Sequence, residues 1–134
     1  KRYIIETLST ADLSFKNMAF FVDAPYPIHA QHVCHDVLKG HVDYGLLICG
    51  SGIGMAMSAN RLNGIRAVCA SSQLEARLAR EHNDANVLCL GERLITPMHA
   101  SEIISTFIKT DFEGGRHINR VKIIDVVNCL SPVN

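Results

Sequence analysis

The sequence has no excess of charge of either sign. Its 13 lysines and arginines balance 13 aspartates and glutamates over 134 residues. A chain without net charge creates no overall field that would attract nucleic acid or an acidic membrane surface. We therefore expect no nucleic-acid partner, and any phosphate group must be held by local arginines.

Long apolar runs and paired cysteines are also missing. No segment approaches the length of a membrane span, and the first residues, KRYIIETLST, lack the apolar run of a signal peptide. The five cysteines are odd in number and include no CxxC pair, and Cys49, Cys69 and Cys89 lie in or at the ends of apolar segments. This usage is typical of a reducing compartment. We expect a cytoplasmic protein with no membrane partner.

The chain contains no internal repeat, low-complexity segment or linker, so residues 1–134 are expected to form one domain. Helix-breaking residues, caps and apolar periodicity predict strands at 44–49, 65–70 and 86–90, and helices at 27–40, 53–62, 72–81, 97–109 and 116–128. Ser72 with Glu75 predicts a capping box, and Thr96 with Pro97 predicts a helix start. Such alternation indicates a three-layer, Rossmann-like α/β fold, in which helices cover both faces of a parallel sheet. Ligands of these sheets bind beyond the carboxyl ends of the strands, where Cys49 falls.

A glycine-rich loop follows Cys49 in the segment LLICGSGIGMAMSANR. Gly50, Gly52 and Gly54 free backbone N–H groups at the start of a helix, which makes an anion-binding concavity beside a thiol. The third glycine comes one residue too early for a dinucleotide fingerprint, so we expect no NAD binding. A phosphatase loop would need arginine at position 55, which is Met55. A tight turn beside an inert, buried cysteine is the structural alternative.

Three further clusters contain residues that could take part in catalysis or ligand binding. His82 and Asn83, in EHNDAN, lie at a helix end, where a helix cap and catalysis are both reasonable interpretations. Arg116 and Arg120 lie four residues apart on one helix face, a spacing that suits one phosphate but is also common in solvated pairs, and Arg93 could join them.

The third cluster is a run of histidines, which resembles a metal site by composition. At i, i+3, i+6 spacing on a helix the side chains drift around the helix axis, so we expect solvated histidines and no metal. The run comprises His29, His32 and His35, with Asp36 beside it.

Three motifs together resemble one family. The segments CGSGIGMAMSANRLNGIRA, ARLAREHNDANVLCLGER and FEGGRHINRV closely resemble the ribose-5-phosphate isomerase B family, which includes the two-subunit galactose-6-phosphate isomerases. The resemblance runs from about Asp43 to Val127, and before it only Tyr26 and Pro27 match. It implies isomerisation of an aldose phosphate to a ketose phosphate through a cis-enediolate, without a cofactor. Ribose, galactose and allose phosphates are the candidate substrates.

The resemblance assigns roles that the chemistry of the residues fits. Cys49 is implied as the base, and the positive end of the following helix favours a thiolate there. Ser51 and the loop amides would stabilise the developing negative charge. His82 is implied to open the sugar ring, since an imidazole exchanges protons near neutral pH. The implied substrate-binding residues are Tyr26, Gly50, Gly52, Gly54, Asn83, Arg93, Arg116 and Arg120.

The predicted topology separates the two catalytic candidates. Cys49 ends a strand, whereas His82 follows a helix and precedes a strand, so the two lie at opposite edges of the sheet. A helix of ten residues spans about 15 Å. We therefore expect an active site shared between subunits of a homodimer or homotetramer, as the resemblance also implies.

The N-terminal part departs from the family pattern. Family members begin with a strand that ends in an Asp-His pair, which has no counterpart before Lys1, and residues 1–21 match the first helix and second strand only loosely. Two alternatives to an isomerase remain, of which the first gains weight from this departure. The chain could be a phosphosugar-binding subunit without turnover, or a cysteine phospho-carrier that resembles the IIB proteins of sugar transport, with phosphate accepted by Cys49.

Overall fold

A computed structural model describes residues 14–16 and 23–126 of the chain. Its centre is a parallel sheet of three strands in the order β1-β3-β2, comprising β1 (Gly45–Cys49), β2 (Ala67–Cys69) and β3 (Val87–Gly91). All five residues of β3 are buried, as expected for the central strand of a sheet covered on both faces. The predicted parallel sheet is therefore confirmed.

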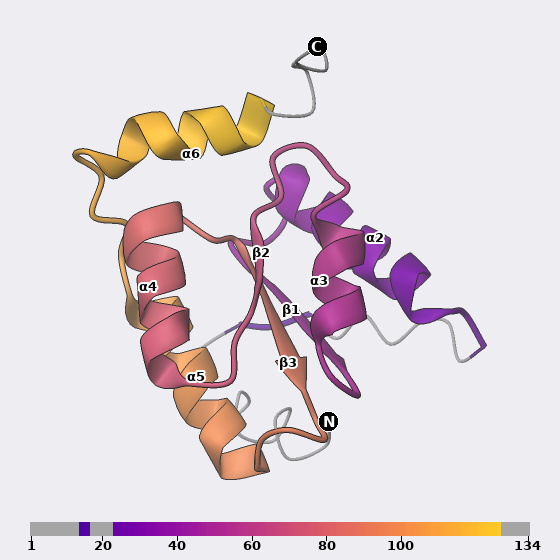
Figure 1. The fold of residues 1–134 in the computed structure, drawn as a ribbon. Coiled ribbons are helices and arrows are strands. Elements are labelled where there is room, and N and C mark those ends of the chain that lie inside the picture. The colour runs from indigo at the N-terminus through magenta and orange to yellow at the C-terminus, as the bar shows by residue number, and fades with distance from the viewer. Residues whose placement is uncertain (1–13, 17–22, 127–134) are drawn as a thin grey trace, which may run out of the picture.

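Helices cover both faces of this sheet (Figure 1). One side carries α2 (Tyr26–Leu38) and α3 (Ile53–Ala59), and the other carries α4 (Gln73–Asn83) and α5 (Pro97–Lys109). The last described helix, α6 (His117–Val126), lies across the end of α4. Side chains of β3 alternate between the two layers. Leu88 and Leu90 pack with α4 and α5, whereas Val87 and Cys89 pack with α2 and α3.

The predicted elements between residues 26 and 126 are present, but several ends differ. Helix α3 stops at Ala59 because the Asn60 amide pairs with the backbone of Ala67, donating to its oxygen at 2.9 Å and accepting from its nitrogen at 2.8 Å. Strand β2 begins only at Ala67, since the Arg66 amide donates to the Asn86 side chain. The correspondences predicted for residues 1–21 lie almost wholly outside the described residues, as does the end of the last helix beyond residue 126.

Helix α4 is fixed at both ends. The predicted capping box is confirmed, because Ser72 Oγ accepts from the Glu75 amide at 3.2 Å and the Glu75 carboxylate accepts from the Ser72 amide at 3.0 Å. Hydrogen bonds from Ser71 and Ser72 lower the pKa of Glu75. The helix extends two residues beyond the predicted end at Glu81, to Asn83, and Asp84 in the left-handed conformation ends it. His82 therefore lies in the last helical turn.

No helix in the two described ranges is both long enough and apolar enough to span a bilayer.

The glycine loop packs tightly against the end of β3. A Cβ on Gly91 would lie 2.7 Å from the backbone carbonyl atoms of Ser51. Gly52 adopts a φ of +79°, and a Cβ there would lie 2.8 Å from Cys69 Sγ. Glycine at these two positions allows the loop to sit directly over the carboxyl ends of the strands.

We expect Gly91→Ala to lower the free energy of unfolding by about 1–3 kcal/mol, because the added methyl group meets backbone that must move. Urea unfolding measures this cost, and the amide chemical shifts of residues 50–52 report the displacement. Gly45→Ala is the matched control on β1, because its methyl group would meet the side chains of Val33 and Val87. Unchanged shifts in residues 50–52 of Gly91→Ala would contradict the described packing.

Candidate active site

The sulfur of Cys49 faces a backbone donor of the glycine loop. The Gly52 amide donates to Cys49 Sγ at 3.2 Å, and the Ile53 amide lies 3.4 Å from Ser51 Oγ. Cys49 ends β1 and is half-buried. The loop thus directs an amide at the thiol, as the spacing of the glycines predicts. A negative charge on this sulfur is stabilised by that donor.

The other described cysteines are suited to remain thiols. Burial raises the pKa of Cys34 to about 11 and also raises the pKa of Cys89. Burial and the nearby Cys49 raise the pKa of Cys69, whose Sγ donates to the Ser51 carbonyl oxygen at 3.5 Å. Cys49 is the described cysteine whose sulfur accepts a hydrogen bond from a backbone amide of the glycine loop.

Tyr26 and Arg93 complete a first group around this loop. A Cβ on Gly54 would lie 2.7 Å from Tyr26 Oη, so the tyrosine ring covers that glycine. A Cβ on Gly50 would lie 3.3 Å from Arg93 Cζ, and the Arg93 amide donates to the Gly50 carbonyl at 3.1 Å. We call this group the cysteine cluster, which comprises Tyr26, Cys49, Gly50, Ser51, Gly52, Gly54 and Arg93.

A second group forms where α4 ends and α6 begins. The rings of His82 and His117 stack with centroids 4.4 Å apart and planes 9° apart. Arg116 Nε lies 3.5 Å from His117 Nε2, and the Glu113 amide donates to the Glu81 carbonyl oxygen at 3.1 Å. This histidine cluster comprises His82, Asn83, Glu113, Arg116, His117 and Arg120.

His117 is a site residue that the sequence analysis did not single out. It is 5% exposed, whereas its neighbours Arg116 and Arg120 are exposed. Burial lowers the pKa of His117, and the charges of His82, Arg116 and Arg120 act in the same direction. Burial therefore favours the neutral form of the ring that stacks on His82. Its position beside Arg116 in FEGGRH was the available sequence signal.

The two clusters lie at opposite ends of the sheet. Cys49 pairs with Gly91 at the end of β3, whereas His82 precedes Val87, the first residue of β3. Four residue steps along a parallel strand cover about 13 Å. In Figure 1 the arrowhead of β3 points away from α6. The predicted separation of Cys49 and His82 within one chain is confirmed.

Arg93 lies apart from Arg116 and Arg120 within one chain. The sequence suggests that it could join Arg116 and Arg120 around a phosphate, but within one chain it lies against Gly50 in the cysteine cluster. Arg93 follows the carboxyl end of β3, whereas the other two arginines flank His117 near the end of α4. Joint binding of a phosphate by all three requires a second chain.

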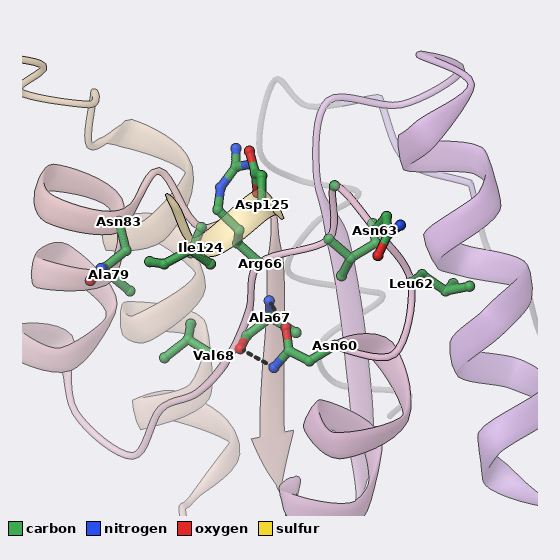
Figure 2. A pocket seen from close by; sticks show the side chains of 13 residues that line it. Asn60, Leu62, Asn63, Arg66, Ala67, Val68, Ala79, Asn83, Ile124 and Asp125 are labelled. Carbon is green, nitrogen blue, oxygen red and sulfur yellow. Dashed lines mark hydrogen bonds and ion pairs between the residues drawn. The ribbon is translucent and has the colours of Figure 1, made fainter. Parts of the chain in front are cut away.

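A pocket of about 390 Å³ lies between α4, α6 and residues 60–68 (Figure 2). Arg66 lines it, with its guanidinium 3.1 Å from an Asp84 oxygen and 3.0 Å from both Asp125 oxygens. Two carboxylates already balance this cation, so the pocket is poorly suited to a phosphate. Its ion pairs instead attach α6 and the end of α4 to the start of β2. Asn83 is the predicted site residue on its wall.

The helix histidines do not converge on a common point. Within the described parts of the chain, the group of ligating side chains close enough to share a metal ion consists of His82, Glu113 and His117. His29, His32 and His35 lie on α2 and are not part of this group.

Comparison with known proteins identifies the family. The model of the ribose/galactose isomerase family matches residues 1–124. The chain is 43% identical over 102 residues to ribose-5-phosphate isomerase B of Escherichia coli, covering 76% of this chain and 68% of that protein. It is 34% identical over 130 residues to ribose-5-P isomerase B of Listeria innocua, covering 96% and 88% of the two chains.

A solved structure shows the same fold. The ribose 5-phosphate isomerase of Thermotoga maritima superposes with a TM-score of 0.88 at 38% identity, covering 92% of this chain and 87% of that one. The chain thus matches these isomerases in fold and sequence over most of its length. The matching part contains the sheet, the glycine loop and the two clusters. The chain belongs to the ribose/galactose isomerase family of enzymes.

Proposed function

We propose that this chain interconverts ribose 5-phosphate and ribulose 5-phosphate through a cis-enediolate, without a cofactor. The observation that carries the proposal is the amide of Gly52 directed at the sulfur of Cys49 at the carboxyl end of β1. The two relatives and the solved structure described above are named as ribose 5-phosphate isomerases, which supports the choice of sugar phosphate.

Cys49 acts as the base in this proposal. Its thiolate removes a proton from the carbon next to the sugar carbonyl and returns it to the neighbouring carbon. Negative charge then develops on two substrate oxygens, and preorganised donors near these oxygens lower the barrier. The proposed donors are the hydroxyl of Ser51 and the loop amides of Gly50, Gly52 and Gly54, of which the Gly52 amide donates to the thiol at 3.2 Å.

The histidine cluster supplies the remaining roles. His82 transfers the proton that opens the sugar ring, and Asn83 binds sugar or enediolate oxygens. Arg116 and Arg120 bind the phosphate from their positions beside His117. Arg93 and Tyr26 contact the substrate from the cysteine cluster. Charge-assisted hydrogen bonds from guanidinium groups are well suited to a phosphate.

The active site is shared between two subunits in this proposal. Cys49 and His82 must each come within about 3 Å of atoms of one small sugar. The two ends of β3, near which Cys49 and His82 lie, are about 13 Å apart in one chain, and a second copy can bring its histidine cluster to the cysteine cluster. A homodimer is sufficient, and a homotetramer would contain the same pairs.

Galactose 6-phosphate and allose 6-phosphate are the alternative substrates, and a binding subunit without turnover is the alternative role. An assay with all three sugar phosphates separates them. We place the reaction in the cytoplasm, because the described cysteines are free thiols and thiols persist in reducing compartments.

Mixing two inactive variants tests the shared site. Cys49→Ala and His82→Ala should each lose nearly all isomerase activity alone. Dissociation and reassociation of an equal mixture should restore up to about one quarter of the wild-type activity, since half of random dimers pair the two variants and each such dimer has one intact site. Isomerisation of ribose 5-phosphate measures the recovery.

A mixture that stays inactive although mass spectrometry shows mixed dimers would contradict the shared site. A mixture of Cys49→Ala with Cys49→Ser is the control, because no pairing of these two chains restores the base.

Arg116→Gln and Arg120→Gln should raise KM for ribose 5-phosphate by about tenfold or more, since a hydrogen bond to a charged group contributes about 1.5–3 kcal/mol. Inorganic phosphate should also inhibit these variants less strongly. Arg77→Gln is the control, because Arg77 is exposed on α4 and its ion pair with Glu81 is long, at 3.9 Å. An unchanged KM in both cluster variants would remove these arginines from the phosphate site.

A further inference from the structure

We propose that the histidine cluster binds a zinc ion through His82, Glu113 and His117. One ligand atom from each of these residues lies within 4.8 Å of the other two. Two imidazoles and one carboxylate form a common protein ligand set for zinc, and they leave a fourth position for water or substrate. Mg²⁺ and Ca²⁺ prefer sites made of oxygen ligands alone, so the donor set favours zinc over them.

The three ligand side chains differ in how freely they can move, and the more exposed ones can approach an ion held by His117. His117 is buried and serves as a fixed ligand, with its Nε2 3.5 Å from the Glu113 carboxylate. The Glu113 side chain is 54% exposed on a loop, and His82 is half-buried. Metal bonds of about 2.1 Å place tetrahedral ligand atoms about 3.4 Å apart. The His82 ring must therefore tilt toward the fixed His117 ring, and the Glu113 carboxylate must move toward both rings.

The positive charge of Arg116 limits the affinity of the histidine cluster for zinc. Arg116 Nε lies 3.5 Å from His117 Nε2, the atom nearest the Glu113 carboxylate, and must rotate away when zinc binds. Arg116 is exposed, so this movement meets little resistance. Zinc binding thus requires Arg116 to move away from His117, whereas binding of the substrate phosphate requires Arg116 to stay in the cluster. The ion also occupies a lone pair of His82 that proton transfer requires.

Zinc is thus a reversible inhibitor that competes with the sugar phosphate. This consequence rests on the proposed function, whereas zinc binding itself does not. Calorimetric titration of the full chain with zinc chloride, in the absence of substrate, tests binding independently of activity. We expect one ion per chain, and EDTA should restore any lost isomerase activity.

Glu113→Gln is the decisive variant, because it removes the carboxylate and leaves the proposed catalytic residues unchanged. It should weaken zinc binding by roughly tenfold or more, since even the loss of an outer hydrogen-bond partner costs a metal site about 10–100-fold. Glu102→Gln is the matched control. Glu102 also lies 3.2 Å from a histidine, His99, but this pair is not part of a group of three possible ligands among the described residues.

Cobalt substitution separates this site from the thiols. Cobalt held by two histidines and a glutamate lacks the strong near-ultraviolet band that a cobalt–thiolate bond gives. Weak visible bands that disappear in Glu113→Gln would support the proposal. A thiolate band, no binding of zinc, or equal affinity in Glu113→Gln and the wild type would overturn it. Zinc binding without isomerase activity would instead count against the proposed function alone.

Discussion

The parallel pairing of β1 with β3 determines where chemistry can occur in this chain. It aligns Cys49 with Gly91 and places the glycine loop directly over the end of β3. The same strand begins at the opposite end of the sheet, shortly after α4, so His82 is held away from Cys49. Two clusters of polar residues at the two ends of one short sheet follow from this register.

Buried charges hold the far end of this arrangement in place. Arg80 is 6% exposed, donates to Asp84 and to the carbonyl oxygens of Ala85 and Thr110, and lies over the Tyr44 ring at 4.8 Å. Arg66 extends the same network through Asp84 to Asp125 on α6. Because both helix ends are tied to these cations, the stack of His82 on His117 has a defined position. Removing one member of such a network would leave a partly buried charge without its partner.

Local patterns predicted much of the fold. The Ser72–Glu75 capping box, the Thr96 cap and the apolar run of β3 depend on neighbours in sequence, and the structure contains all three. Element ends were less predictable, because contacts between distant segments determine them. The Asn60 amide that ends α3 pairs with Ala67, and no local rule identifies that partner. The opposite placement of Cys49 and His82 could be predicted, since it follows from topology alone.

The histidine cluster shows why site prediction from sequence is incomplete. His117 stacks on His82 across 35 positions of sequence, and Arg66 reaches Asp125 across 59. Residue type alone does not reveal such pairs. A crystal structure with a hydroxamate analogue of the enediolate tests the central claim most directly. We predict that Cys49 of one subunit and His82 of its neighbour both lie within hydrogen-bond distance of one ligand. A ligand contacted by Cys49 and His82 of the same chain would contradict the account.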